Sequence, residues 1–252
     1  MMDSCIPNNH FIVFSSGRNC QNYASANINS IKNQNYNNFI HIVIDDNSTD
    51  NTWKCIQELK HDKLITYQNT QRNYWIANAK RYLEPIIQSE NDIIIIVDLD
   101  DHLVHSQVLT KLNDIYNTKD MWVVYGNHNI NQDGTKLFGK PIPPIILKEK
   151  TFRIAKWGVA HPRTFRAFLW KYIKDEDLRD EEGQYFKCSY DRAILYPIIE
   201  MSPPDKIYSN PEWFYSYNIS NPNNVGRKNP ELQTKTSRYI KSKIPYKTLE
   251  LK

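Results

Sequence analysis

Short apolar runs alternate with segments of helical spacing along the first half of the chain. The runs have the length of β-strands and occupy residues 11–14, 39–44, 64–67 and 92–97. Between the second and third runs, Trp53, Ile56 and Leu59 recur at the spacing that places side chains on one face of a helix. The same reasoning predicts helices over residues 75–83 and 106–116 and a strand over residues 122–125. This succession predicts an α/β fold with a mainly parallel central sheet flanked by helices.

Polar side chains gather where three of these predicted strands end. Ser15 and Ser16 follow the first run, residues 45–50 follow the second, and residues 98–101 follow the fourth. In open sheets of parallel strands, ligands bind outside the carboxyl ends of the strands. The pattern therefore predicts a ligand site at this edge of the sheet.

The second half of the chain is less regular. We predict helices over residues 165–173 and 191–201, a strand over residues 213–217, and a polar loop over residues 218–230. The sequence has no internal repeat, and no linker divides it into two independent units. The sequence therefore predicts a single domain.

Charge is unevenly distributed. The 252 residues carry a formal net charge of +4, but the segment 228–252 alone carries +5 because it has seven basic and two acidic residues. The remaining chain is thus close to −1. A basic tail without a recognisable nucleic-acid-binding motif does not predict a nucleic-acid partner. The four cysteines form no CxxC pair, which argues against a zinc site.

Two absences bear on location. The longest apolar run is far shorter than the roughly 20 residues of a membrane helix. The first residues also lack the basic start and apolar stretch of a signal peptide. We therefore predict no membrane span and a cytoplasmic location, which for a viral chain means the host cytoplasm or the virion.

The carboxylates after the fourth strand are the strongest local signal of chemistry. Asp98, Asp100 and Asp101 lie within four residues, where their charges repel one another unless a cation is present. Oxygen ligands of this kind suit Mg²⁺ or Mn²⁺, which also bridge phosphate oxygens. The alternative is a turn whose carboxylates cap the following helix.

Asp45 and Asp46 are the second signal. A carboxylate at a strand end can accept hydrogen bonds from a nucleobase edge or from ribose hydroxyls. The alternative is an Asx turn followed by a helix cap, which accounts for residues 48–50.

Two segments resemble a known family. Residues 11–56, with the turn Ser-Ser-Gly-Arg-Asn at 15–19 and Ile-Asp-Asp-Asn-Ser-Thr-Asp at 44–50, closely resemble the N-terminal half of family 2 glycosyltransferases, which have the GT-A fold. Val-Asp-Leu-Asp-Asp at 97–101 matches their DxD motif. Residues 157–165 and 190–201 look like acceptor-side segments of a bacterial and giant-virus branch of the family.

The resemblance implies an organisation and a set of binding residues. A GT-A domain would occupy residues 1–227, with a nucleotide-sugar-binding half at 1–130 and an acceptor half at 131–227, followed by the basic tail at 228–252. Asp100, together with Asp98, would bind the metal. The implied donor-nucleotide residues are Ser15, Ser16, Asp45, Asp46, Asn73, Asn78, Asp98 and Arg227. Asn73 and Asn78 flank Trp75, which stands near a position where the family usually has glycine.

The resemblance also implies catalytic and sugar-side residues. Asp191 matches the position of the family's catalytic Asp and would deprotonate the acceptor hydroxyl in an inverting transfer. The alternatives are a helix N-cap role for Asp191 and a base at Glu181 or Glu182. Trp157 and His161 would lie on the side of the donor sugar and acceptor, and His128 is a further donor-pocket candidate.

The expected protein is a metal-dependent glycosyltransferase that uses Mn²⁺ or Mg²⁺. Its partners would be a UDP-sugar donor and a hydroxyl-bearing glycan or protein acceptor, and a homodimer is possible. The alternatives are a non-catalytic nucleotide-sugar-binding protein and a sugar nucleotidyltransferase. The second is disfavoured because its glycine-rich loop after the first strand is replaced here by a segment with only Gly17.

Overall fold

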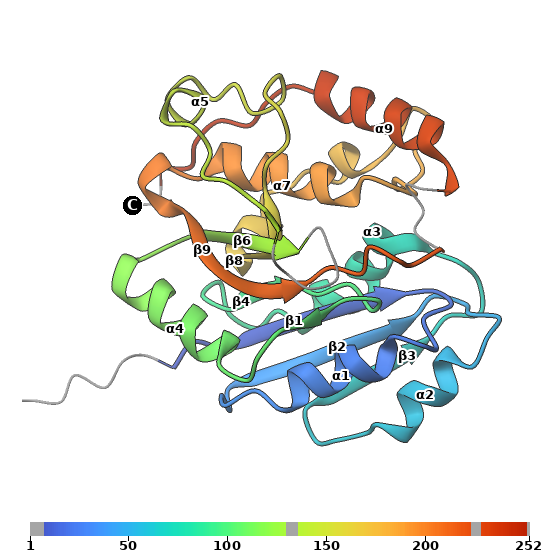
Figure 1. The fold of residues 1–252 in the computed structure, drawn as a ribbon. Helices are drawn as coiled ribbons and strands as arrows, with labels where there is room; N and C mark the ends of the chain where they lie inside the picture. The colour runs from blue at the N-terminus through green and yellow to red at the C-terminus, as the bar shows by residue number, and fades with distance from the viewer. Residues whose placement is uncertain (1–7, 130–135, 223–227, 251–252) are drawn as a thin grey trace, which may run out of the picture.

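The computed structural model describes residues 8–129, 136–222 and 228–250. Its strands form one mixed sheet in the order β3-β2-β1-β4-β8-β6-β9-β5, with β7 paired to β6 (Figure 1). The strands are β1 Phe11–Gly17, β2 Phe39–Asp45, β3 Leu64–Gln68, β4 Ile93–Ile96, β5 His102–Leu103, β6 Val123–Asn129, β7 Leu137–Phe138, β8 Ala160–Arg166 and β9 Ile207–Ser216.

The first half of the sheet is parallel. β3, β2, β1 and β4 run in one direction, with Phe11 opposite both Phe39 and Ile93. The four isoleucines of β4 are fully buried, and alternate ones belong to two different apolar clusters. Both faces of this strand are therefore covered, which is why its sequence is apolar at every position rather than at every second one.

The second half of the sheet departs from the parallel pattern. β8 lies antiparallel between β4 and β6, while β9 runs parallel to β6. The predicted helix over residues 165–173 was wrong at its start, because Phe165 and Arg166 end strand β8 and helix α6 begins at Ala167. β8 contains His161, Arg163 and Thr164, which are buried although they are polar. The strand consequently lacks an apolar run.

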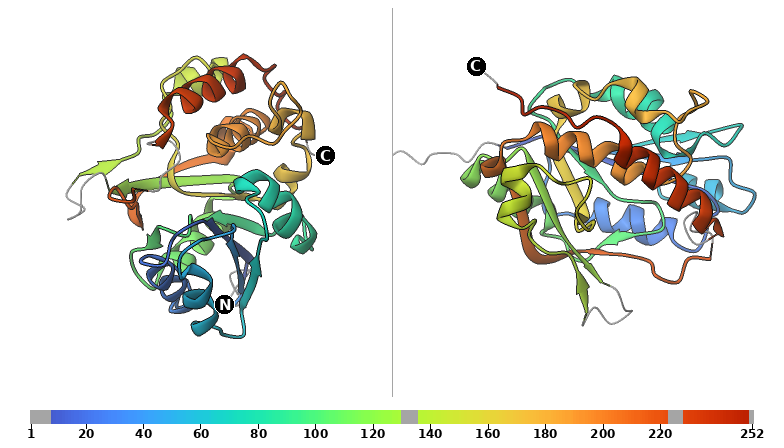
Figure 2. Two further views of the ribbon diagram at one scale, coloured as in Figure 1. Left: turned by 90° about the vertical axis from the view of Figure 1, so that its right-hand side faces the viewer. Right: turned by 90° about the horizontal axis from the view of Figure 1, so that it is seen from above.

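Helices cover both faces of the sheet. α1 and α4 pack on the face that carries Phe11 and Ile95, and α2 packs with α1. α3, α6, α7 and α9 contribute to the apolar cluster on the opposite face. Figure 1 shows the two helical layers below and above the sheet, and Figure 2 shows them from two further sides. The helices are α1 Ala24–Lys32, α2 Thr52–Glu58, α3 Tyr74–Asn78, α4 Val108–Lys119, α5 Pro144–Glu149, α6 Ala167–Lys171, α7 Tyr190–Met201 and α9 Pro230–Ser242.

Part of the basic C-terminal segment is built into the domain. Helix α9 lies beside α7, and Ser237 Oγ is 3.1 Å from Ser189 Oγ. The guanidinium of Arg153 donates to the carbonyl of Ile240 at 2.7 Å and binds both carboxylate oxygens of the buried Glu200 at 2.6 and 2.8 Å. These contacts fix the end of α9 on the layer formed by α7. None of the described helices has the length and apolar character that crossing a membrane requires.

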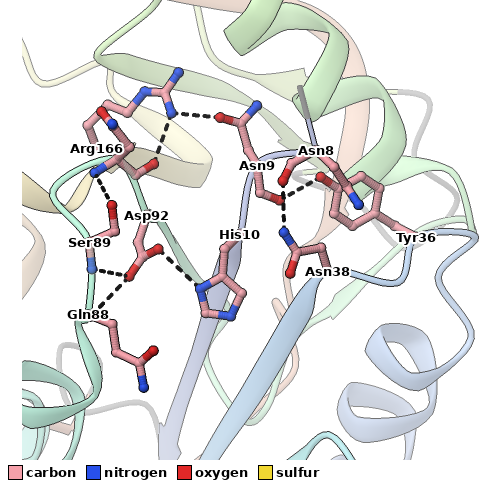
Figure 3. A network of polar contacts seen from close by, with 10 residues as sticks. Asn8, Asn9, His10, Tyr36, Asn38, Gln88, Ser89, Asp92 and Arg166 are labelled. Atoms are coloured by element: carbon pink, nitrogen blue, oxygen red, sulfur yellow. Dashed lines mark hydrogen bonds and ion pairs between the residues drawn. The ribbon is translucent and has the colours of Figure 1, made fainter. Parts of the chain in front are cut away.

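A polar network joins the amino ends of the parallel strands (Figure 3). Asp92, just before β4, binds His10 Nδ1 at 3.2 Å. Arg166, at the end of the antiparallel β8, donates to the side chain of Asn9 at 2.7 Å, and the Tyr36 hydroxyl donates to the Asn9 carbonyl at 2.5 Å. The members satisfy one another at the edge of the sheet opposite the carboxyl ends, so this network has a structural role.

Candidate active site

A cavity of about 510 Å³ opens at the carboxyl ends of β1, β2 and β4. The chain leaves β1 toward β2 on one side and returns as β4 on the other, so the direction of strand order reverses between β1 and β4. Such a reversal leaves a crevice at the strand ends, where ligands of α/β proteins bind. The predicted site residues that line this cavity are Ser16, Asp46, Asp98, Asp100, Trp157, His161 and Asp191.

Asp98 and Asp100 line the cavity after β4, and Asp101 is buried beside them. Burial and the neighbouring charge of Asp100 raise the pKa of Asp98 to about 7. Burial also raises the pKa of Asp100, and burial together with the charges of Asp100 and Asp98 raises the pKa of Asp101 well above its usual range. A bound cation would relieve this repulsion.

Each of these carboxylates has a hydrogen-bond partner from a distant part of the chain. The Tyr190 hydroxyl lies 2.6 and 2.5 Å from the two carboxylate oxygens of Asp98. Asn221 donates its amide to Asp100 at 2.5 Å, and the Tyr215 hydroxyl donates to Asp101 at 2.6 Å. The motif is therefore held by residues near the start of α7 and near the end of β9.

The backbone of residues 98–101 is fixed by a side chain of helix α1. The buried side chain of Asn27, in α1, donates to the carbonyls of Asp98 and Asp101 at 3.0 and 2.9 Å. One amide thus ties together both ends of the turn. The carboxylates consequently project from a rigid support rather than from a free loop.

The carboxylates after β4 fit one mode of metal binding. Among residues 8–129, 136–222 and 228–250, no group of three or more His, Cys, Asp or Glu side chains is arranged to hold a metal ion. Mg²⁺, however, is often held by one or two carboxylates together with substrate phosphates and water. Asp98 and Asp100 line the same cavity and fit that mode.

The two carboxylates at the end of β2, Asp45 and Asp46, lie in different surroundings. Asp45 is fully buried, and it accepts hydrogen bonds from the backbone N–H of Ser48 and from the side chain of Gln68. This is the Asx-turn alternative, and Asp45 does not line the cavity. Asp46 lines the cavity and accepts from the backbone N–H groups of Asn73 and Tyr74 at 2.8 and 2.9 Å. Asp46 therefore fixes the loop that precedes α3.

Ser16 forms the cavity wall beside Asp46, and Ser15 and Asn78 lie behind it. The Ser15 hydroxyl is buried and lies 2.9 Å from His41 Nε2, so it points into the protein. The Ser16 hydroxyl lines the cavity and accepts from the Asn78 amide at 3.0 Å. Ser15 and Asn78 support this wall, and Ser16 is the member that reaches the open space.

Asp191 lies at the first turn of α7. Its side chain is one-fifth exposed, and Oδ2 accepts from Nη2 of the buried Arg163 at 3.1 Å. The helix N-cap position is occupied by Ser189, so the N-cap alternative for Asp191 is not what the structure contains. A carboxylate thus stands in the cavity next to one compensating cation.

The other sugar-side candidates lie in the mixed half of the sheet, with His128 on β6, His161 on β8 and Trp157 in the loop that precedes β8. His161 is buried and stacks on Tyr215 with ring centroids 4.4 Å apart. Trp157 packs edge-on against Tyr196, and His128 lines the same cavity. Arg227 lies outside the described residues, whereas the neighbouring Lys228 lines a smaller pocket with Arg18.

Known proteins similar in sequence to this chain are glycosyltransferases. A family model described as Glycosyl transferase family 2 matches residues 16–176, which is more than half of the chain. The chain belongs to this family. An Escherichia coli relative, UDP-Glc:alpha-D-GlcNAc-diphosphoundecaprenol beta-1,3-glucosyltransferase WfaP, is 28% identical over 125 residues, or 49% of this chain and 48% of the relative. The chain thus spans about half the length of this curated relative.

Solved structures of similar fold include two glycosyltransferases. S. aureus TarS 1-349 in complex with UDP-GlcNAc superposes with a TM-score of 0.60 at 17% identity, covering 84% of this chain and 59% of TarS 1-349. Glucosyl-3-phosphoglycerate synthase from Mycobacterium tuberculosis, in complex with Mn²⁺, UDP and glucosyl-3-phosphoglycerate, gives 0.60 at 14% identity, covering 94% and 81%. The predicted α/β GT-A fold class is confirmed.

Two site residues of this family 2 chain were not assigned a role from sequence. Arg163 lies in β8 and Tyr190 begins α7, both within segments whose resemblance to the family was noted. The available sequence signals were an arginine two residues after His161 and a tyrosine directly before the candidate base Asp191. Neither type of signal reveals its partner, because Asp98 is 92 residues from Tyr190 along the chain.

Proposed function

We propose that this chain transfers a sugar from a UDP-sugar to an acceptor hydroxyl, with inversion at the anomeric carbon and with Mn²⁺ or Mg²⁺. The observation that carries the proposal is the convergence of Asp46, Asp98 and Asp100 with Asp191 in one cavity at the strand-order reversal. Family membership and the glucosyltransferase relative support sugar transfer. The UDP-GlcNAc complex of TarS supports a uridine nucleotide as donor.

The nucleotide is proposed to occupy the part of the cavity next to β1 and β2. Ser16 would contact it directly, and Asp46 would accept from a ribose hydroxyl or the uracil edge while it fixes the loop at Asn73. Ser15, Asp45 and Asn78 act from behind this wall through their hydrogen bonds to neighbouring side chains and backbone. Mutation of Asp45 is therefore expected to act through the shape of the turn.

The metal is proposed to be held by Asp100 and Asp98. It would neutralise charge on the nucleoside diphosphate that leaves. Asn221 and Tyr190 keep the two carboxylates in position through hydrogen bonds. These hydrogen bonds orient the carboxylates before the donor arrives, which lowers the reorganisation needed on binding.

Asp191 is proposed to take the proton of the acceptor hydroxyl. The hydroxyl oxygen attacks the anomeric carbon, the bond to the diphosphate breaks, and the proton moves to the Asp191 carboxylate. Arg163 donates to Oδ2 of this carboxylate and so fixes its orientation. A base held in this way is pre-positioned for the acceptor.

Calorimetric titration with UDP tests the donor part of the proposal. Wild type is expected to bind UDP more tightly with Mn²⁺ than with EDTA, and Asp100→Asn is expected to lose that difference. Asp114→Asn, on an exposed part of α4 remote from the cavity, is the matched control. Absence of any UDP binding by the wild type would overturn the proposal.

Turnover separates an enzyme from a non-catalytic binding protein. A panel of UDP-sugars is incubated with the protein, Mn²⁺ and hydroxyl-bearing acceptors, and the UDP that forms is measured. Asp191→Asn is expected to bind UDP like the wild type. It is expected to form UDP from the UDP-sugar more slowly by about two orders of magnitude or more. Equal rates for the two proteins would remove Asp191 as the base.

A further inference from the structure

Large apolar side chains are exposed at few places on the described surface. Among the described residues, the exposed ones are Leu137, Ile145, Ile154, Tyr172 and Ile244. The three isoleucines are the most exposed of the five, at 61%, 84% and 86%. Ile145 is in α5 and Ile154 follows that helix, whereas Ile244 comes just after α9.

The segments that carry these isoleucines, residues 140–156 and 241–250, lie against each other. The guanidinium of Arg153 donates to a carbonyl in the last turn of α9 at 2.7 Å, and the ammonium of Lys150 binds the hydroxyl of Thr248. Figures 1 and 2 show α5 and α9 on the side of α7 that faces away from the sheet. The isoleucines therefore project from one outer layer of the molecule.

Lysines accompany the isoleucines in this layer. Each isoleucine has at least one exposed or half-exposed lysine within three residues along the chain, and these are Lys148, Lys156, Lys241 and Lys247. In the part of the chain that the structure describes, none of the four forms an ion pair with a carboxylate. We call the three isoleucines and these four lysines the outer face.

Positive charge is concentrated around the outer face. Residues 140–156 and 241–250 together carry eight basic and two acidic residues, although the whole chain carries only +4. Arg153 is neutralised by Glu200, and Lys243 lies 3.7 Å from Asp177. The two segments therefore keep a charge of +4 when these two pairs are counted as neutral, and the rest of the chain supplies no excess of positive charge.

Exposed aliphatic side chains among lysines suit the surface of a membrane. At the boundary between headgroups and acyl chains, the aliphatic side chain leaves water while the flexible lysine stem keeps its ammonium among the phosphates. Acidic phospholipids attract lysines that lie near the surface. Protein interfaces, in contrast, are depleted of lysine and enriched in aromatic residues, and the exposed apolar side chains of the outer face are all isoleucine.

We propose that the outer face binds to a membrane surface that carries acidic phospholipids, without crossing the membrane. None of its seven members lines the cavity at the carboxyl ends of the strands. The inference is therefore separate from the proposed function, and the failure of either leaves the other unaffected.

Cosedimentation with lipid vesicles tests the proposal. The protein is mixed with vesicles of phosphatidylcholine alone, or of phosphatidylcholine and phosphatidylglycerol in a ratio of about two to one, and the bound fraction is measured against lipid concentration. We expect binding to the mixed vesicles at low salt and much weaker binding to phosphatidylcholine alone. Added salt is expected to weaken binding to the mixed vesicles, because it screens the attraction between lysine and phosphate.

Double variants separate the apolar and the charged contributions. Ile154→Ser with Ile244→Ser removes the two most exposed apolar side chains and is expected to weaken binding to the mixed vesicles about tenfold or more. Ile154→Leu with Ile244→Leu keeps the apolar area and is expected to bind like the wild type. Lys148→Gln with Lys247→Gln is expected to weaken binding about tenfold or more.

The matched control is Lys54→Gln with Lys60→Gln, which removes two exposed charges in and just after α2, on the other side of the sheet. This control is expected to bind the mixed vesicles like the wild type. An equal loss in the control and in Lys148→Gln with Lys247→Gln would overturn the proposal, because overall charge would then explain the binding. No binding of the wild type to mixed vesicles, or unchanged binding by the serine variant, would overturn it as well.

A second copy of the chain is the competing occupant of the outer face. Sedimentation velocity without lipid is expected to give the same oligomeric state for the wild type and the serine variant. A dimer that the serine variant dissociates would assign the outer face to self-association and overturn the membrane proposal. All six substituted side chains are exposed, so thermal unfolding is expected to give the same melting temperature for every variant.

Discussion

Removing the Tyr190 hydroxyl is expected to weaken metal-dependent donor binding. This hydroxyl is the group that holds Asp98, at 2.6 and 2.5 Å from its two oxygens. The Tyr190 ring stacks on Trp75 with centroids 4.5 Å apart and planes 5° apart, so Tyr190→Phe would keep the ring in place and delete only the hydrogen bond. The variant therefore isolates the positioning of Asp98.

The size of the effect follows from the kind of bond. A hydrogen bond to a charged group contributes about 1.5–3 kcal/mol, and the partial exposure of Tyr190 favours the lower end because water can replace it. If the loss falls wholly on the Asp98 conformation that binds donor and metal, a loss of about 1.4 kcal/mol weakens UDP affinity with Mn²⁺ about tenfold. The same loss in the free protein lowers the melting temperature by about 3–6 °C.

The assay is calorimetric titration of UDP with Mn²⁺ and with EDTA, together with thermal unfolding. Tyr67→Phe is the control, because Tyr67 stacks on Tyr82 in the apolar cluster on the α7 side of the sheet and lies outside the cavity. UDP affinity of Tyr190→Phe equal to wild type in Mn²⁺ would refute the idea that this hydroxyl positions Asp98. A loss of equal size in EDTA would point to a general change of shape instead.

Three further predictions concern stability. Burial lowers the pKa of His41 to about 3, so below pH 6.5 the unfolded chain takes up a proton that the folded chain does not. The free energy of unfolding measured in urea should therefore fall by about 2 kcal/mol between pH 7.5 and pH 5. His41→Gln should remove that part of the loss. Glu200→Gln leaves Arg153 without its buried counter-charge and should lower the free energy of unfolding by about 3–5 kcal/mol, measured in the same way. Gly17→Ala brings its Cβ to 2.6 Å from a neighbouring side-chain carbon and should cost about 1–3 kcal/mol, whereas a Cβ at Gly158 meets nothing within 4 Å, so Gly158→Ala should change stability by less than about 0.5 kcal/mol.

The parallel half of the fold could be predicted from sequence because its strands are marked by composition. β4 is buried on both faces, so all four of its residues are apolar, and β2 is almost as uniform. β8 is equally central, lying between β4 and β6, but its buried residues include His161 and Arg163. A strand whose side chains form a polar site has no apolar pattern, and sequence reasoning therefore missed it.

The candidate site shows the same division. The positions of the predicted strand ends were enough to predict that Ser16, Asp46 and Asp98 lie in one cavity, because adjacent parallel strands end at one edge of the sheet. Which of two neighbouring residues faces the cavity was not predictable, because it depends on partners elsewhere. Ser15 is turned inward by His41, and Asp45 is engaged by the turn at Ser48.

The start of α7 connects the two sides of the proposed reaction. Tyr190 binds Asp98 on the donor side, and the next residue, Asp191, is the candidate base and binds Arg163 on β8. Because these are consecutive residues at one helix end, a shift of α7 would move the support of Asp98, the proposed metal ligand, together with the candidate base. Ser189, just before them, is 3.1 Å from Ser237 of α9, and Gln233 of α9 lines the same cavity. Helix α9 thus packs beside the segment that carries both proposed roles, so we expect α9 to hold that segment at a fixed distance from β4.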